Sequence, residues 1–398
     1  MASAETSVTA RTSLTGGRQK TKIGLVLQGG GALGAYEAGA VKCLYDRGME
    51  CTIVAGASSG AVNAVTLAAA KTYPPDELEA MWKGFITPGI LVPPPIGPAQ
   101  HVGAVGVPHM YRPRLDYWSL PTWTYAADNT PLKKTLERLA WEQARDPDHM
   151  RVFVSASDVE NGKTVYFSNL HPKRKLPGPE YPAVHLGVEH ALASGSFPGG
   201  FAWTIIDGRA YWDGGLTDNT PLHPVIDNLT PAEAEAMPIY VIDVNTSAGY
   251  MPTNLLHVVL REFEMLLQNN LQTDTHRAAR YAQFIVLLKK VDSILVQEDA
   301  ARLLDEVRDL SSAPSGLADL LSELLEVKNT DDWREAVAYD PVRNVHAFDI
   351  KKPAGESPGD FTGEAIERRL EDGYRQMCGY LDYPGRGPGT WVSSASHG

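Results

Sequence analysis

The length and charge of this chain set limits on what it can be. It has 398 residues, of which 43% are hydrophobic and 21% charged, a balance typical of a folded protein rather than a disordered one. Asp and Glu number 48 against 36 Lys and Arg, and the net charge of −12 argues against nucleic acid as a partner and against a broad electrostatic grip on anionic membranes.

The cysteines and the N-terminal residues indicate in which cellular compartment we expect the protein. Cys43, Cys51 and Cys378 are far apart and odd in number, so we expect neither a disulfide framework nor a cysteine metal site. Residues 1–20 are rich in Ser, Thr and Gly and lack the apolar core of a signal peptide, which predicts a disordered tail. No window approaches the roughly 18 apolar residues of a membrane span. We therefore predict a cytoplasmic protein that is at most peripheral to a membrane.

Two strand–turn–helix units follow the tail. Lys22 to Gln28 is a nearly continuous apolar run, typical of a buried parallel strand, and a glycine-rich turn at Gly29 to Gly34 leads into a helix over Ala35 to Asp46. A second apolar run, Ile53 to Ala55, passes through another glycine turn into a helix that ends at about Ala70. This order predicts an α/β domain with a parallel sheet, and it places both glycine turns at the carboxyl ends of strands.

The middle of the chain differs in composition from the residues before it. Phe85 to Tyr125 is rich in Pro, Gly and aromatic residues, which predicts a long lid or binding loop for an apolar substrate, with plain packing of a surface loop as the alternative. Arg151 to Ser157 and Thr164 to Ser168 are expected strands, and Asn161-Gly162 between them is a hairpin turn signal.

The last third of the chain has a different composition. Ile239 to Val244 is the last buried strand that the sequence predicts. Beyond it, charged amphipathic stretches follow, so we divide the chain into a catalytic domain over 21–245 and a mostly helical extension over 246–398 that packs on it. Leu255 to Leu271 and Leu317 to Val327 carry apolar stripes but no chemical motif.

The turn after the second strand contains a candidate nucleophile. Gly56-Ala57-Ser58-Ser59-Gly60 is a G-x-S-x-G with Ser58 at its centre, and the small residues suit a strained strand-to-helix elbow. A serine there faces a helix N-terminus, which favours the negative charge of an acyl-transfer intermediate. The alternative is the glycine turn of short-chain dehydrogenases, but Val62 stands where those proteins need a further glycine, and the stretch follows the second strand rather than the first.

The first glycine turn also has two interpretations. Gly29 to Gly34 fits the dinucleotide pattern G-x-G-x-x-G, but that pattern wants an acidic residue at the end of the second strand, and Glu50 precedes that strand. Acyl transfer would instead use the backbone N–H groups of Gly29, Gly30 and Gly31 as an oxyanion hole, where one donor is typically worth about 3–4 kcal/mol in the transition state.

Asp213 is the candidate base. It precedes Gly214 and Gly215, a pattern that in many proteins is only a turn. Tyr211 and Trp212 can shield the carboxylate from water, and such burial would raise its pKa toward the value that a base for a serine needs.

The sequence gives no indication of a catalytic histidine. An α/β-hydrolase triad needs a histidine after its acid. His223, His257 and His276 follow Asp213 outside any recognisable motif, and we expect His185 and His190 to be ordinary polar residues.

Three motifs together resemble one family. GGGALG, GASSG and DGG, with ASGSFP between the last two, resemble in their order the patatin-like phospholipases over roughly Lys22 to Val244. The resemblance implies a three-layer α/β/α sandwich with a mainly parallel sheet and a Ser–Asp dyad without histidine. Ser58 matches the nucleophile, Asp213 the base and Gly29 to Gly31 the oxyanion hole. Gly34, Gly56, Gly60, Gly214 and Gly215 match supporting positions, and Asn219-Thr220-Pro221 also resembles the family; Leu33 departs from it, since many members carry Lys or Arg there.

The resemblance implies a serine lipid acyl hydrolase, of phospholipase A or lysophospholipase type, that needs no cofactor or metal. Its partners would be a lipid or another fatty-acyl ester and, transiently, a membrane surface, while the oligomeric state is not indicated. An acyltransferase or thioesterase with the same dyad, or a catalytically weak lipid-binding regulatory protein, are the alternatives.

Overall fold

A computed structural model describes residues 20–87, 106–170, 184–245, 344–353 and 356–383, together with residue 265. The tail over 1–19, the amphipathic stretches after residue 250 and part of the Pro-rich loop lie outside these ranges. The strands are β1 (Thr21–Leu27), β2 (Met49–Gly56), β3 (Arg112–Pro113), β4 (Tyr125–Asp128), β5 (Arg151–Asp158), β6 (Thr164–Ser168), β7 (Gly199–Phe201), β8 (Thr204–Ile206), β9 (Arg209–Asp213), β10 (Ile239–Asp243) and β11 (Val345–Asp349).

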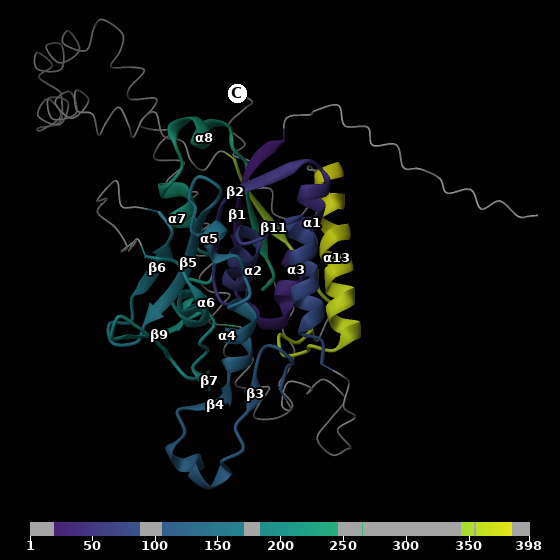
Figure 1. The fold of residues 1–398 in the computed structure, drawn as a ribbon. Helices are drawn as coiled ribbons and strands as arrows, with labels where there is room; N and C mark the ends of the chain where they lie inside the picture. The colour runs from purple at the N-terminus through teal and green to yellow at the C-terminus, as the bar shows by residue number, and fades with distance from the viewer. Residues whose placement is uncertain are drawn as a thin grey trace, which may run out of the picture.

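The α-helices lie between and after these strands (Figure 1). They are α1 (Gly34–Asp46), α2 (Ser59–Ala68), α3 (Pro74–Gly84), α4 (Thr130–Leu136), α5 (Trp141–Ala144), α6 (Val188–Ser194), α7 (Leu222–Asp227), α8 (Pro231–Ala236) and α13 (Gly363–Asp382). Short 3₁₀ helices cover Gly31–Leu33, Tyr117–Thr122 and Gly214–Leu216. Within the described ranges, no helix combines the length and apolarity that a bilayer crossing requires.

One large sheet organises the molecule. Its strand order is β11-β10-β1-β2-β5-β9-β8, with β6 paired to β5. The strands from β11 to β5 run parallel, whereas β6 and β9 pair antiparallel with β5, and β8 pairs antiparallel with β9. The expected α/β fold with a mainly parallel sheet is therefore confirmed, and so is the hairpin from β5 to β6, in which Gly162 adopts the positive φ of 63° that the turn needs.

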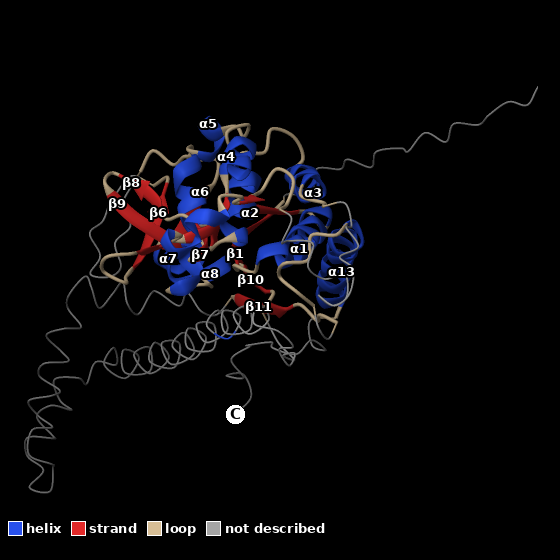
Figure 2. Ribbon diagram, turned by 90° about the horizontal axis from the view of Figure 1, so that it is seen from below, coloured by secondary structure: helices blue, strands red, loops and turns tan. Residues whose placement is uncertain are grey.

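Helices cover both faces of this sheet (Figure 2). Alternate side chains of β1 point to opposite faces: Leu25 and Leu27 join the core under α1, α2, α3 and α13, and Val26 joins a smaller core under α7 and α8. Each of these three side chains is fully buried. The strands are apolar on both faces because each face meets a helical layer, which explains the near-continuous hydrophobic runs in the sequence.

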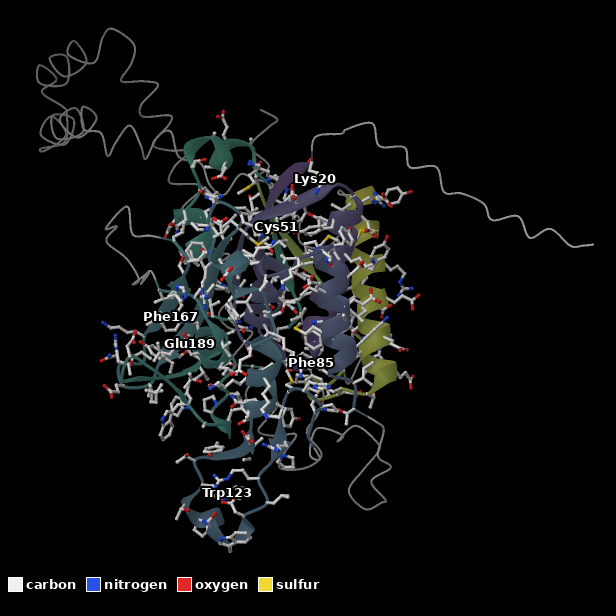
Figure 3. The ribbon with its side chains drawn as sticks, in the orientation of Figure 1. Lys20, Cys51, Phe85, Trp123, Phe167 and Glu189 are labelled. Carbon is white, nitrogen blue, oxygen red and sulfur yellow. A yellow bond between two sulfur atoms is a disulfide. The ribbon has the colours of Figure 1, made fainter. Side chains whose placement is uncertain are left out.

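Residues 112–128 form an excursion that projects from the body of the molecule, and Figure 3 shows Trp123 within it. The guanidinium of Arg114 lies 4.5 Å from the ring centroid of Trp123 and 4.6 Å from that of Tyr125. Trp118 is 85% exposed and Leu115 69% exposed, an unusual position for large apolar side chains. The expectation of a lid or binding loop stays a prediction.

The chain after the undescribed segment returns to the sheet. β11 pairs in parallel with β10, so the C-terminal region contributes a strand that the sequence analysis did not foresee. α13 then lies along α1 (Figure 1), and the two backbones are in close contact. A Cβ atom on Gly39 would lie 2.1 Å from the carbonyl oxygen of Leu370, and one on Gly373 would lie 2.1 Å from that of Tyr36. The division of the chain at residue 245 stays a prediction.

The expectation of a chain without a disulfide is wrong. Cys43 in α1 and Cys378 in α13 form a disulfide, and Cys51 is free and buried. The two partners are 335 residues apart in sequence and meet only because α13 packs along α1. Cysteine spacing could not reveal this pair, because the contact depends on helix packing.

The glycine contact between α1 and α13 predicts a stability difference between two substitutions in one helix. Gly373→Ala should lower the free energy of unfolding by about 1–3 kcal/mol, because the new methyl group overlaps the Tyr36 carbonyl. Gly379→Ala is the matched control: nothing lies within 4 Å of its added Cβ, so the higher helix propensity of Ala should stabilise by about 0.5–1 kcal/mol. Urea denaturation of both variants measures the difference, and equal effects would contradict the packing described.

Candidate active site

Ser58 occupies a strained turn between β2 and α2. Its φ of 52° and ψ of −120° lie in a region that residues with a Cβ rarely adopt. The flanking glycines make the turn possible, because a Cβ on Gly56 would lie 2.3 Å from the carbonyl oxygen of Gly60, and one on Gly60 would lie 2.2 Å from that of Leu27. The Ser58 N–H donates to Ser194 Oγ at 2.8 Å, which ties the turn to α6. The G-x-S-x-G spacing is therefore a steric requirement of this elbow.

The sheet register brings Asp213 to the serine. Gly56 at the end of β2 pairs with Val154 of β5, and Asp213 at the end of β9 pairs with Ala156 of the same strand. The Ser58 hydroxyl donates to Asp213 Oδ2 at 2.7 Å. The other carboxylate oxygen, Oδ1, accepts the N–H of Gly215 at 2.8 Å, which fixes the orientation of the carboxylate.

The Asp213 carboxylate is shielded from solvent. The residue is 1% exposed, and burial raises its pKa to about 7, against the lowering effect of the hydrogen bonds from Ser58 and Gly215. This is the direction that the sequence analysis expected. A carboxylate of this basicity, in hydrogen-bond contact with a serine hydroxyl, can accept the hydroxyl proton near neutral pH.

The glycine turn after β1 lies directly against the serine, since a Cβ on Gly29 would be 2.8 Å from the Cβ of Ser58. Two of the three N–H groups expected to form an oxyanion hole are already paired. Gly29 N–H donates to Asn219 Oδ1, and Gly30 N–H donates to Ser59 Oγ, each at 3.0 Å. Gly31 has a positive φ of 56°, and its N–H takes no acceptor among the described residues. Of the three N–H groups, that of Gly31 is therefore the one without an acceptor in the described part of the chain.

Three polar side chains at this site were not candidates in the sequence analysis. Asn219 both accepts from Gly29 N–H and donates to the Gly29 carbonyl, Ser59 accepts from Gly30, and Ser194 accepts from Ser58. Their signals were present in the sequence, since each lies within a quoted motif. Residue type alone did not show that their partners would be the backbone of the turn and the elbow.

The supporting glycines have steric roles. A Cβ on Gly34 would lie 2.7 Å from the ring of Trp82, and one on Gly214 would lie 2.3 Å from both the carbonyl oxygen and the Oγ of Ser155. Gly215 supplies the N–H that holds Asp213. These positions allow the turns on either side of the dyad to pack closely.

In the described ranges, no histidine contacts Ser58 or Asp213. His190 Nδ1 accepts the N–H of Gly187, and its ring packs against Phe167 at 4.7 Å between centroids. His185 and His223 are exposed, and His257 and His276 lie outside these ranges. The described part of the chain also holds no cluster of His, Cys, Asp or Glu suited to a metal ion.

The buried carboxylate predicts a pH-dependent stability. Native Asp213 keeps its proton up to about pH 7, whereas the unfolded chain releases it near pH 4, so the native state binds more protons between these values and stability falls as pH rises. Asp213→Asn removes this penalty, and its stability relative to the unsubstituted protein should rise by about 2–3 kcal/mol from pH 5 to pH 8.

Denaturation midpoints at pH 5, 6, 7 and 8 provide the measurement. Ser58→Ala serves as the control, because it leaves the buried carboxylate in place and should keep the pH dependence. A constant difference between Asp213→Asn and the unsubstituted protein over this range would show that the carboxylate is not held protonated by burial.

A comparison with protein families agrees with the motifs. A sequence model described as patatin-like phospholipase matches residues 25–226, about half of the chain. Among solved structures, VipD from Legionella pneumophila matches with a TM-score of 0.40 and 17% sequence identity, over 92% of this chain and 67% of that one. No curated protein sequence matches.

Proposed function

The chain belongs to the patatin-like phospholipase family, and we propose that it is a serine lipid acyl hydrolase that cleaves fatty-acyl esters through Ser58 and Asp213. The observation that carries the proposal is the 2.7 Å hydrogen bond from Ser58 Oγ to Asp213 Oδ2. A hydroxyl on a strained elbow, in contact with a buried carboxylate, is the arrangement that nucleophilic acyl transfer requires. The family description supports a phospholipid as the substrate class.

Acylation begins with Ser58. Its Oγ attacks the ester carbonyl while Asp213 Oδ2 accepts the hydroxyl proton. The tetrahedral intermediate carries its negative charge on the former carbonyl oxygen. When the C–O bond to the alcohol breaks, the leaving oxygen takes the proton from Asp213, and the acyl group remains on Ser58.

Deacylation repeats these steps with water. A water molecule gives a proton to Asp213 and attacks the acyl carbonyl, and the second tetrahedral intermediate releases the fatty acid. The proton returns from Asp213 to Ser58 Oγ, which restores the starting state. One carboxylate therefore serves both half-reactions, and no histidine is needed.

Two features support stabilisation of the oxyanion. Helix α2 begins at Ser59, so its positive end faces the reacting carbonyl. The Gly31 N–H, which has no acceptor among the described residues, lies in the turn that contacts Ser58. Both are fixed before the substrate arrives, and such preorganised dipoles contribute most when they need not reorient.

The dyad predicts the outcome of covalent labelling. A fluorophosphonate should add one phosphonyl group to the unsubstituted protein, with loss of fluoride, and none to Ser58→Ala. Hydrolysis of a p-nitrophenyl fatty-acyl ester should fall by at least about 10³-fold in Ser58→Ala and in Asp213→Asn, because one loses the nucleophile and the other the base. Intact mass and initial rates are the measurements.

Thr72→Ala is a suitable control for this experiment, because Thr72 is exposed and its hydroxyl hydrogen-bonds only to Glu77 among the described residues. It should keep both the adduct and the turnover. Labelling that persists in Ser58→Ala, or an unsubstituted protein without adduct and turnover on detergent-dispersed phospholipid, would refute the proposed hydrolase.

The raised pKa of Asp213 predicts the acid limb of the activity. The base must be ionised to accept a proton, so kcat/KM should fall as pH drops through about 7, and by roughly tenfold for each further pH unit. Ester hydrolysis measured from pH 5 to pH 9 tests this. A limb near pH 4, the value of an ordinary aspartate, would contradict the assignment of a buried Asp213 as the base.

A further inference from the structure

We propose that the C-terminal residues 356–369 hold the glycine turn in its active geometry, with Arg369 as the positioning residue. This inference rests on the proposed function, because it concerns the Gly31 N–H as oxyanion donor. The segment lies outside residues 25–226, the part of the chain that matches the family.

The first observation is a backbone contact. The Pro358 carbonyl accepts the N–H of Ala32 at 2.8 Å, and a Cβ on Gly31 would lie 2.6 Å from the same oxygen. The C-terminal segment therefore touches the turn at the residue that carries the candidate donor and at the residue after it. A side chain at position 31 would clash with this carbonyl and would also be strained by the positive φ.

Arg369 connects that segment to the turn. It is fully buried, and each guanidinium nitrogen is a donor. Nη1 donates to the Asp360 carbonyl at 2.5 Å and to the Ala32 carbonyl at 3.3 Å, and Nη2 donates to the Ser357 carbonyl at 2.9 Å. Nε donates to Glu356 Oε1 at 2.6 Å. One side chain thus fixes residues 356–360 and reaches the turn itself.

Neutralising the negative charge of Glu356 does not by itself explain why Arg369 is buried. Arg368 already donates to both carboxylate oxygens of Glu356, at 2.6 and 2.7 Å. Arg368 is partly exposed, whereas Arg369 is fully buried, and burying a guanidinium costs more than filling the space with a hydrophobic side chain of similar volume. What Arg369 adds is three carbonyl contacts: those with Ser357 and Asp360 set the path of the chain on both sides of Pro358, and the third reaches Ala32.

The geometry of the turn explains why this path matters for the donor. The Gly31 N–H belongs to the peptide between Gly30 and Gly31. On one side, Gly30 N–H is held by Ser59 Oγ, and on the other side both polar groups of Ala32 are held, by Pro358 and Arg369. Because its neighbours are fixed, the peptide that carries the Gly31 N–H cannot rotate without breaking one of these contacts.

Helix α13 holds Arg369 rigidly relative to the turn. α1 begins at Gly34, directly after the turn, and it is joined to α13 by the Cys43–Cys378 disulfide and by the close contacts of Gly39 and Gly373. Arg47 and Asp382 form a further ion pair at the far ends of the two helices. The positioning residue therefore lies on a helix that is attached at several points to the helix following the turn.

The test compares kcat and KM of full-length variants with a p-nitrophenyl fatty-acyl ester. Arg369→Met should lower kcat by about 10- to 100-fold with KM little changed, since a misdirected donor weakens transition-state binding only. Arg369→Lys should recover part of the loss. Glu356→Gln, which keeps the shape of the side chain, should lower kcat several-fold, and it decides the question if Arg369→Met does not fold.

Gly379→Ala and Arg375→Met are the controls. Gly379 lies in the same helix, where nothing is within 4 Å of an added Cβ, and Arg375 is an exposed arginine that pairs with Asp372. Both should keep kcat per folded molecule, measured well below their unfolding temperatures. If Arg369→Met and Glu356→Gln match these controls in kcat, Arg369 has only a structural role and the inference is overturned. If the unsubstituted protein neither hydrolyses the ester nor forms a phosphonate adduct, the proposed function itself fails.

Discussion

The hydrogen bond between Ser58 and Asp213 is the interaction on which the rest of the site depends. It requires that two strands that are not neighbours end close together, and β5 between them supplies this by pairing with β2 in parallel and with β9 in antiparallel orientation. The antiparallel strand is therefore essential, because it delivers a carboxylate to the carboxyl edge of a largely parallel sheet. A sheet that was parallel throughout would place the end of β9 and the turn after it in a different relation to the elbow.

The burial of Asp213 affects both the stability of the fold and the strength of the base. The same lack of solvent that gives the carboxylate a pKa of about 7 makes its ionised form costly to the fold. The cost is limited by two donors, the Ser58 hydroxyl and the Gly215 N–H. Such a site lowers the stability of the fold, but it gives Asp213 the basicity that the proposed reaction needs.

The glycine turn is a hydrogen-bonded network in which the Gly31 N–H has no acceptor among the described residues. Side chains of Asn219 and Ser59 accept from the N–H groups of Gly29 and Gly30, and the C-terminal segment accepts from Ala32. Buried N–H groups normally need partners, so pairing the neighbours stabilises the turn, and the Gly31 N–H is the group without a described acceptor. In the proposed mechanism the substrate oxygen takes that place.

The sequence by itself determined the fold class and the positions of Ser58 and Asp213. Apolar runs mark buried parallel strands, and glycines at 56, 60 and 214 mark sites where a Cβ would overlap backbone, so both signals are local and visible in the residue order. Only the tertiary structure decided the partners of the glycine turn, the pairing of Cys43 with Cys378, and the addition of β11 and α13. These contacts join residues far apart in sequence, and their energies depend on packing and register, which no short stretch of sequence contains.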